Sequence, residues 1–283
     1  MTPASPSREN GRRPVFQGGT LRRTVCEGKF FLRFDLPARH NRRVIGAFLN
    51  ALGILLGALF GLVRRELPAV RTQNFFKSAL AAATAFFGLR LVWENVHGTF
   101  ASGLKQLFLA ALAVVLGNWL GKILRLQKIS NRLGRHASGL LTAAQKNPPG
   151  QPADGFLAAT ILFCAAPLGL IGAVTDGLSG YFYLLAVKAV MDALAMMSFV
   201  KIFRWPAALA AVPVYLFLNG LTLAVHSGAR PWLEPLALIG SVNLAAGIIV
   251  CAMVLVILEV RRVELANYLP ALALAPLLAR FLG

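Results

Sequence analysis

The sequence predicts an all-α fold, a polytopic transmembrane helix bundle with seven or eight spans. Of the 283 residues, 57% are hydrophobic and only 14% are charged, and the mean hydropathy is +0.65. Soluble domains carry about a quarter charged residues, so this composition is typical of membrane proteins. The second observation is a series of apolar segments, most of them long enough to cross a bilayer core of about 30 Å at 1.5 Å per residue.

The apolar segments follow one another from residue 44 to residue 282. Pro167, inside the fourth segment, predicts a kink that frees a backbone carbonyl. The last segment, 266–282, is short and carries two prolines, so it predicts either a short span or a half-helix. The other seven segments have the length of a span and cover 44–63, 75–93, 104–124, 155–175, 181–203, 206–226 and 236–258.

Two polar regions lie outside the predicted spans. Residues 1–43 carry ten Lys and Arg against three acidic residues and show no apolar periodicity, so they predict a basic, disordered tail. The longest connection, 125–154, is basic and contains KNPPGQP, which cannot continue a helix. It is predicted to be a cytoplasmic linker within the transmembrane domain 44–283, between the first three spans (44–124) and the remaining spans (155–283).

The basic residues of the loops predict an orientation, because Lys and Arg stay on the cytoplasmic side. The first, third, fifth and seventh loops contain basic residues, the sixth contains only Arg230, and the second (94–103) and fourth (around 176–180) contain none. This alternation places the beginning of the first span outside the cytoplasm. The tail, with its ten basic residues, should instead stay inside.

Three hypotheses resolve this conflict. The tail is translocated despite its charge, or the first segment is a re-entrant hairpin, or the tail is not part of the natural protein and translation begins near Val44. No secretory signal is expected, because no charged and then apolar run within the first 30 residues ends in a small-residue cleavage site.

The composition and the missing motifs exclude several classes of function. The net charge of +18 collects in loops, so no nucleic-acid partner is expected. The three cysteines are isolated and the four histidines are scattered, which predicts neither a disulfide framework nor a metal site. The sequence contains no HExxH, GxSxG, P-loop or GxGxxG motif. We therefore expect no enzyme, no catalytic residue, no metal and no cofactor.

Four blocks of sequence are similar to those of a known family: GAFLNALGILLGALFGL (46–62), LFCAAPLGLIGAVTDGLSG (162–180), LLAVKAVMDALAMMSF (184–199) and NYLPALALAPLL (267–278). From about residue 45 to its end, the chain resembles the bacterial membrane-protein family named domain of unknown function 554. The resemblance implies a multi-pass protein of the bacterial cytoplasmic (inner) membrane and leaves the activity open. It does not extend over the tail, which supports the hypothesis of a later start.

Two positions depart from the family pattern. At the end of the third span, where the family pattern has Gly-Glu, this chain has Gly121-Lys122, which inverts a charge. In the sixth span, where the pattern has Gln-Gly, it has Asn219-Gly220, a conservative change. A role of that glutamate elsewhere in the family therefore cannot be carried over to this chain.

The first candidate site is a pair of opposite charges, Lys188 and Asp192, in the middle of the fifth span. On insertion scales each charge costs about 2.5–3.5 kcal/mol at a helix centre. Their four-residue spacing places both side chains on one face, in the order Lys before Asp, which is the weaker one for an intrahelical pair. The pair predicts either an ion-coupling or proton-relay site that lines a pathway, or a structural lock between helices.

Asp176, in the segment AVTDGLSGYF, is the second candidate. An Asp-Gly pair between apolar helices predicts a turn, in which Asp accepts local backbone hydrogen bonds and Gly takes a positive φ. The alternative is that Asp176 ends a broken helix beside the site, where its carboxylate is available to a cation.

Amides within the spans form the third set of candidates. Each needs hydrogen-bond partners in hydrocarbon, so it predicts either a contact between helices or a ligand for a polar solute. Asn50 and Asn243 both lie on glycine-rich faces, which allow close approach of another backbone within one chain or across a dimer. The four amides are Asn50, Asn118, Asn219 and Asn243.

These features predict a transporter or channel for a small polar or charged solute that uses the Lys188–Asp192 pair. The alternative is a non-transporting membrane scaffold or accessory subunit, in which the buried charges and glycine faces serve helix packing. The expected partners are the lipid bilayer, an unknown small solute, and a second copy of the chain through the glycine-rich faces. The candidate pathway or ion-binding residues are Lys188, Asp192, Asp176, Asn50, Asn219 and Asn243.

Overall fold

The computed structural model describes residues 45–64, 69–146, 152–261 and 263–282. Within these ranges the regular elements are all helices, without a β-strand. The all-α prediction is therefore confirmed. The predicted tail, 1–43, lies outside the described residues.

Seven helical segments of the described ranges are long and apolar enough to cross a membrane. The fifth of them runs continuously from Trp205 to Leu233 through a 3-10 turn, an α-helix, a π-helical turn and a last short helix. Their bounds are α1 (Ile45–Val63), α2 (Val70–Asn95), α3 (Phe100–Ile123), α7 (Tyr183–Phe203), the run η2 (Trp205–Ala210), α8 (Ala211–Ala224), η3 (Val225–Ala229) and α9 (Arg230–Leu233), then α10 (Ile239–Ile257), and η4 (Leu265–Tyr268) with α11 (Ala271–Leu282).

The eighth candidate span is a broken one. Helices α5 (Pro152–Ala165) and α6 (Pro167–Ser179) meet at an angle of 56° at Ala166. Pro167 opens α6 and lacks a backbone N–H, and Ala166 before it has extended dihedrals (φ −65°, ψ 119°), as a residue before proline prefers. The kink predicted at Pro167 is confirmed, and the expected single span 155–175 is two half-helices.

The region predicted as a linker, 125–154, contains a helix that the sequence analysis missed. Helix α4 (Leu126–Lys146) packs along α5. Its buried and half-buried apolar residues lie eleven, three, four or seven positions apart and so share one face, which is the pattern of an amphipathic helix. These residues are Leu126, Ala137, Leu140, Leu141 and Ala144, whereas the cationic Lys128, Arg132 and Arg135 are exposed.

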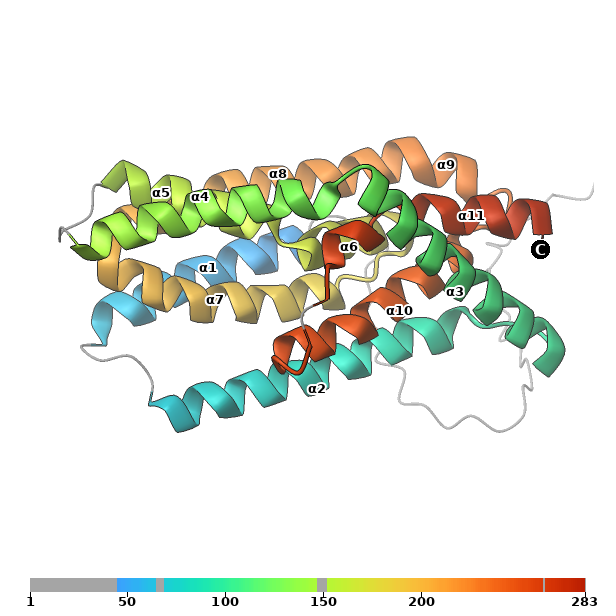
Figure 1. Cartoon of the computed structure of the whole chain (residues 1–283), viewed down its shortest axis with the longest axis horizontal. Coiled ribbons are helices and arrows are strands. Elements are labelled where there is room, and N and C mark those ends of the chain that lie inside the picture. Colours follow the sequence, from blue (N-terminus) through green and yellow to red (C-terminus); the bar gives the residue numbers. More distant parts are fainter. Residues whose placement is uncertain (1–44, 65–68, 147–151, 262, 283) are drawn as a thin grey trace, which may run out of the picture. The chain divides into compact units, whose positions relative to one another are not determined.

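Helices that are far apart in the sequence lie side by side, as α2 and α10 do (Figure 1), and glycines lie at their closest contacts. Helix α1 lies parallel to α7, and a Cβ added at Gly53 or Gly57 would lie 2.5 Å or 2.2 Å from the carbonyl oxygens of Ala189 or Ala193. We call this contact the α1–α7 seam. Helix α2 runs antiparallel to α10 through Gly88 and Gly247, and α3 contacts α11 through Gly117. The glycine-rich face of α1 is thus occupied within the chain.

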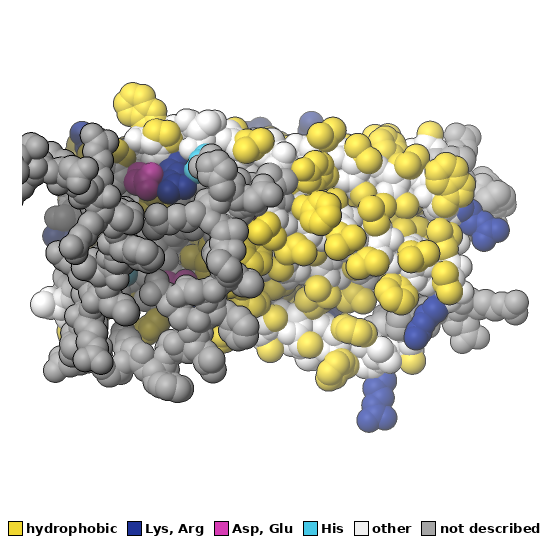
Figure 2. Space-filling model, turned by 180° about the vertical axis from the view of Figure 1, so that it is seen from behind, with side chains coloured by type: hydrophobic (Ala, Val, Ile, Leu, Met, Phe, Trp, Pro, Cys, Tyr) yellow, Lys and Arg dark blue, Asp and Glu magenta, His cyan; other side chains and the backbone are white. Residues whose placement is uncertain are grey.

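The described surface is broadly apolar. Figure 2 shows a large area of hydrophobic side chains on the visible face, with Lys and Arg side chains toward its two ends. Large apolar patches of this kind mark contact with a membrane or a partner rather than with water. Together with the helix lengths, this surface supports a membrane-spanning bundle. Exposed side chains include Leu55, Leu59, Phe60, Val115, Trp119 and Leu216.

Candidate functional site

Lys188 and Asp192 lie inside the bundle, on the face of α7 that contacts α1 and the α5–α6 break. Their side chains are 1% and 8% exposed, and Lys188 Nζ donates a hydrogen bond to Asp192 Oδ2. The predicted pairing on one helix face is therefore present. Neither side chain extends to the bundle surface, so the pair is a feature of the interior.

Asn50 of α1 completes this site. The residue is fully buried, and its Nδ2 donates to the same Asp192 Oδ2 at 2.9 Å. One carboxylate oxygen therefore accepts hydrogen bonds from a cation on its own helix and from an amide on a helix 142 positions away. The Oδ1 of Asn50 has no hydrogen-bond partner among the described residues. We call Asn50, Lys188 and Asp192 the buried charge cluster.

The α5–α6 break provides the space for the lysine. The Lys188 Nζ lies 5.8 Å from the ring centroid of Phe163, in the last turns of α5, within the range of a cation–π contact. Beyond the break, a Cβ added at Gly169 would lie 2.7 Å from Lys188 Cε. The lysine side chain thus occupies the space that a side chain at this position of α6 would take.

Asp176 does not form the turn that the Asp-Gly pair predicts. It lies in the last turn of α6, where the Asp176 backbone oxygen accepts a 2.8 Å hydrogen bond from Gly180. The positive φ, 72°, belongs to Gly180, whereas Gly177 is helical and packs against the backbone of Thr222 on α8. Asp176 and Gly177 therefore form no turn, and Asp176 lies in the last turn of the second half of the broken span. A contact of its carboxylate with a cation stays a prediction.

The Asp176 carboxylate is buried, with 5% of the residue exposed, and neither oxygen has a hydrogen-bond partner among the described residues. It lies against the first turn of α1, because a Cβ added at Gly46 would lie 2.7 Å from Asp176 Oδ2. Gly46 is one helical turn before Asn50. Asp176 is thus a neighbour of the buried charge cluster along α1, but it shares no hydrogen bond with it.

The other predicted amides lie on helices other than α1 and α7, namely α10, α8 and α3. Asn243 of α10 donates to Asn95 Oδ1 of α2 at 3.0 Å, so it connects two helices at a glycine contact. Asn219 and Asn118 are half-buried on α8 and α3, and the Oδ1 of Asn219 has no partner among the described residues. None of these amides is hydrogen-bonded to the buried charge cluster in the described structure.

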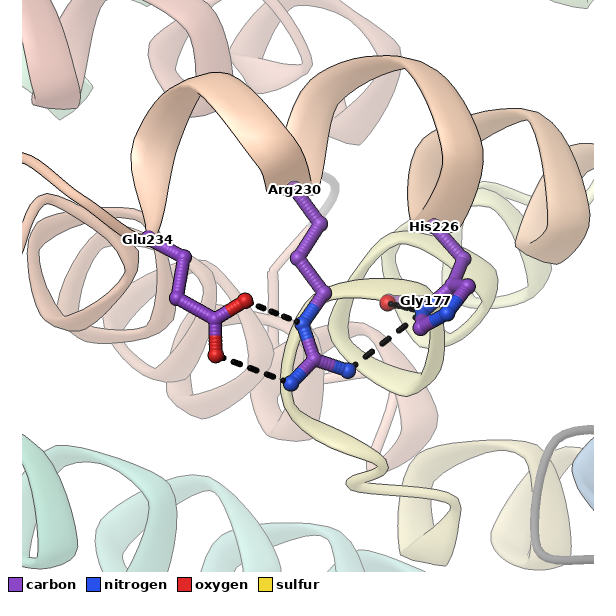
Figure 3. Close-up of polar contacts among 4 residues, drawn as sticks. All are labelled: Gly177, His226, Arg230 and Glu234. Carbon is purple, nitrogen blue, oxygen red and sulfur yellow. Dashed lines mark hydrogen bonds and ion pairs between the residues drawn. The ribbon is translucent and has the colours of Figure 1, made fainter. Parts of the chain in front are cut away.

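A second polar group, absent from the sequence predictions, lies next to Gly177, the residue that follows Asp176 (Figure 3). His226 Nδ1, in the π-helical turn η3, is 3.1 Å from the carbonyl oxygen of Gly177 and 3.4 Å from Arg230 Nη1. Arg230 in turn donates to both carboxylate oxygens of Glu234, at 3.1 Å and 3.0 Å. Because His226, Arg230 and Glu234 are four residues apart, the sequence could have predicted that they share one face of a helix.

Comparison with known proteins places the chain in a family. The model of the family described as "Protein of unknown function (DUF554)" matches residues 45–280. The chain belongs to this family. The match includes every residue of the buried charge cluster and Asp176, and it does not cover the tail.

Two other proteins are similar to the chain over nearly their whole length. The uncharacterized protein YqgA of Escherichia coli (strain K12) is 29% identical over 234 residues, which is 82% of this chain and 94% of YqgA. The uncharacterized membrane protein YdfK of Bacillus subtilis (strain 168) is 23% identical over 240 residues, 82% of this chain and 94% of YdfK. No solved structure matches the chain.

The two departures from the family pattern have different surroundings. Lys122, which replaces the expected glutamate, is exposed in the last turn of α3, whereas Gly121 beside it packs against the backbone of Asn267. The inverted charge is therefore at the bundle surface and not in the interior. Gly220, beside Asn219, has no atom within 4 Å of an added Cβ.

Proposed function

We propose that this chain is a transporter or channel that moves a small polar or charged solute across the membrane. The observation that carries the proposal is the buried charge cluster, a lysine, an aspartate and an amide held together inside an apolar bundle at a broken helix. Broken helices next to buried charges are a recurring arrangement in the binding sites of membrane transporters.

Stability alone is a weak explanation for the cluster. Each charge costs about 2.5–3.5 kcal/mol to insert, and a buried ion pair is often no more stable than well-packed apolar residues of the same volume. The Lys-before-Asp order also contributes less within a helix than the reverse order. Ionisable residues inside a membrane are therefore functional candidates by default.

The chemistry of the cluster suggests how it would work. Asp192 binds a cation or a proton, and Lys188 neutralises the carboxylate when the site is empty. Asn50 holds the carboxylate through Nδ2, and its unpartnered Oδ1 remains as an acceptor for a solute. Asn219 and Asn243 are further candidate ligands along the same bundle. This role involves no enzymatic step, cofactor or resident metal.

We place the chain in a bacterial cytoplasmic membrane, as the family resemblance implies. The loop charges favour an orientation with the beginnings of α1 and α7 and the ends of α6 and α8 on the outer side. These four helix ends are close together, since Gly46 contacts Asp176 and Leu185 and Gly177 contacts Thr222. We refer to them below as the outer end.

The test is a flux measurement on purified protein in vesicles adsorbed to a solid-supported membrane. Currents are recorded after concentration jumps of Na⁺, K⁺, ammonium, amino acids and small carboxylates. Asp192→Asn keeps the shape of the side chain and should abolish any current that the wild type carries, at equal protein content. Asn118→Ala, away from the cluster, should leave it unchanged. Full activity of Asp192→Asn would contradict the proposal.

A scaffold or accessory subunit is the second candidate function. It is favoured by the close packing of the α1–α7 seam and by the main described grooves, which are lined by residues other than those of the cluster. This function predicts that Asp192→Asn lowers the protein level or releases a co-purifying partner, with no flux to lose. Assembly of copies through glycine faces stays a prediction, and it would need a face other than that of α1.

A further inference from the structure

Gly169, Gly172 and Asp176 share one face of α6, and α6 packs against α7. A Cβ added at Gly169 would lie 2.7 Å from Lys188 Cε, and one added at Gly172 would lie 3.0 Å from both Cγ and Cδ2 of Leu185. Asp176 follows one turn later on this face, because positions three and four apart are neighbours on a helix. The glycines leave room on α6 for the side chains of Lys188 and Leu185.

These contacts give an order along the bundle interior. Asp192, Lys188 and Leu185 follow one another on α7, and Asp176 of α6 lies at the outer end beyond Leu185. Gly46 of α1 lies beside both Leu185 and Asp176. A Cβ added at Gly46 would lie 2.5 Å from Leu185 Cδ1 and 2.7 Å from Asp176 Oδ2. Leu185 is fully buried. In the contacts around Gly46, Gly169 and Gly172, the Leu185 side chain is the group that lies between Lys188 and the Asp176 carboxylate.

Asp176 is also next to a titratable group nearer to the surface. Gly177, the following residue, accepts the His226 contact through its carbonyl oxygen, and His226 is half-buried beside Arg230 (Figure 3). The charged and imidazole side chains that these contacts bring near Asp176 are Lys188 and Asp192 of α7, and His226 and Arg230 of η3 and α9. The first turn of α1 that covers it, 45–48, is apolar.

We infer that the coupling ion of the proposed transport is a proton, that Asp176 is its outer site, and that Leu185 is the barrier between the two sites. A proton from the outer side binds Asp176 and converts the carboxylate to a carboxylic acid. When the Leu185 side chain moves aside, water joins the two sites and the proton passes to the Asp192 carboxylate. Asp176 is a carboxylate again, and the Lys188–Asp192 pair separates. Release of the proton inward restores that pair.

The inference rests on the proposed function, and a structural role of Asp176 is its competitor. A carboxylate at the first turn of α1 also interacts favourably with the exposed N–H groups of the helix beginning. That role predicts a less stable protein in Asp176→Asn and no change in proton movement. The two roles therefore differ in a measurable way.

The experiment uses the full chain in proteoliposomes that enclose a pH-sensitive dye. A potassium gradient with valinomycin drives protons inward, and no solute is added. Leu185→Ala should raise proton uptake several-fold over the wild type, because the apolar barrier is shortened. Leu184→Ala is the matched control, since Leu184 is equally buried on α7 but packs in a different apolar cluster. It should not raise uptake.

Two double variants complete the test. Asp176→Asn and Asp192→Asn, each combined with Leu185→Ala, should return uptake to the wild-type level. Leu185→Val, which keeps most of the packing, is measured as well in case Leu185→Ala does not give a monodisperse protein. An unchanged uptake in the leucine variants, or a raised uptake that persists without Asp176, would overturn the inference.

These results can be separated from those on the proposed function. If solute currents depend on Asp192 but no leucine variant takes up protons, proton coupling is contradicted and the proposed transport function still holds. If neither solute currents nor proton uptake is observed, both proposals are contradicted.

Discussion

Asn50 donates its side-chain amide to Asp192 at 2.9 Å, and this hydrogen bond joins α1 to α7 inside the bundle. Asn50→Leu removes a donor from a buried carboxylate, and hydrogen bonds to charged groups are worth about 1.5–3 kcal/mol. We expect a loss of stability of that size, measured as thermal unfolding in nanodiscs. The control Asn118→Leu, at a half-buried position of α3, should change stability much less. Equal effects of the two variants would show that the hydrogen bond contributes nothing.

Lys188 and Asp192 should behave as one unit in a double-mutant cycle. Lys188→Met leaves Asp192 buried without its cation, and breaking a buried pair costs about 3–5 kcal/mol. Asp192→Leu leaves Lys188 buried without its anion, at a similar cost. The double variant Lys188→Met/Asp192→Leu should recover most of the stability while transport stays absent. Additive losses would mean that the two side chains are not coupled.

The α1–α7 seam should not tolerate a methyl group. A Cβ at Gly57 would lie 2.2 Å from the backbone oxygen of Ala193, so the helices must separate in Gly57→Ala. Overpacking of this kind costs about 1–3 kcal/mol. Gly139→Ala on α4 is the control, because nothing lies within 4 Å of its Cβ, and it should stabilise the helix by about 0.5–1 kcal/mol. Thermal unfolding of both variants, with the wild type beside them, measures the difference.

Acid should weaken the contact at the outer end of the α8–α9 run. The hydrogen bonds and the charge of Arg230 lower the pKa of Glu234. A lowered folded-state pKa gives stability that is present above the ordinary glutamate pKa and is lost as pH falls through the lowered value. Unfolding temperatures of the wild type and Glu234→Gln should therefore differ slightly at neutral pH and converge in acid. A gap that widens in acid would contradict this.

Topology reporters test the orientation that the loop charges predict. Fusions at Gly98 should report the outer side, and fusions at Val70 and Leu140 the cytoplasmic side, in chains with and without residues 1–43. If the reporters lie on the opposite sides of the membrane in the chain that includes residues 1–43, the tail determines the orientation of α1.

Much of the fold could be predicted because the membrane imposes it. The apolar segments predicted α1, α3, α7 and α10 to within a few residues, and Pro167 predicted the break. Helix α4 was missed because its charges and the following prolines suggested a loop. Its apolar residues at helical spacing, among them Leu126, Leu133 and Ala137, were nevertheless visible in the sequence.

The site could be predicted only in part. Spacing on one helix was sufficient to pair Lys188 with Asp192. The contribution of Asn50 depends on which helix packs against α7, and no local pattern contains that information. The sequence predicted the positive φ at Gly177, because an Asp-Gly pair favours a turn. In the structure Gly180 has this φ and ends α6, and the contact of Gly177 with α8 could not be known from the sequence.

The parallel pairing of α1 and α7 also has a consequence for synthesis of the chain. The partner of Asn50 is made 142 residues later. At about 5–20 residues per second, this interval is about 7–28 s. During that time α1 is in the bilayer with an unsatisfied amide and an open glycine face. Helix α1 therefore has to wait for the second half of the protein, and temporary protection of α1 by another membrane component would shape how the protein is made.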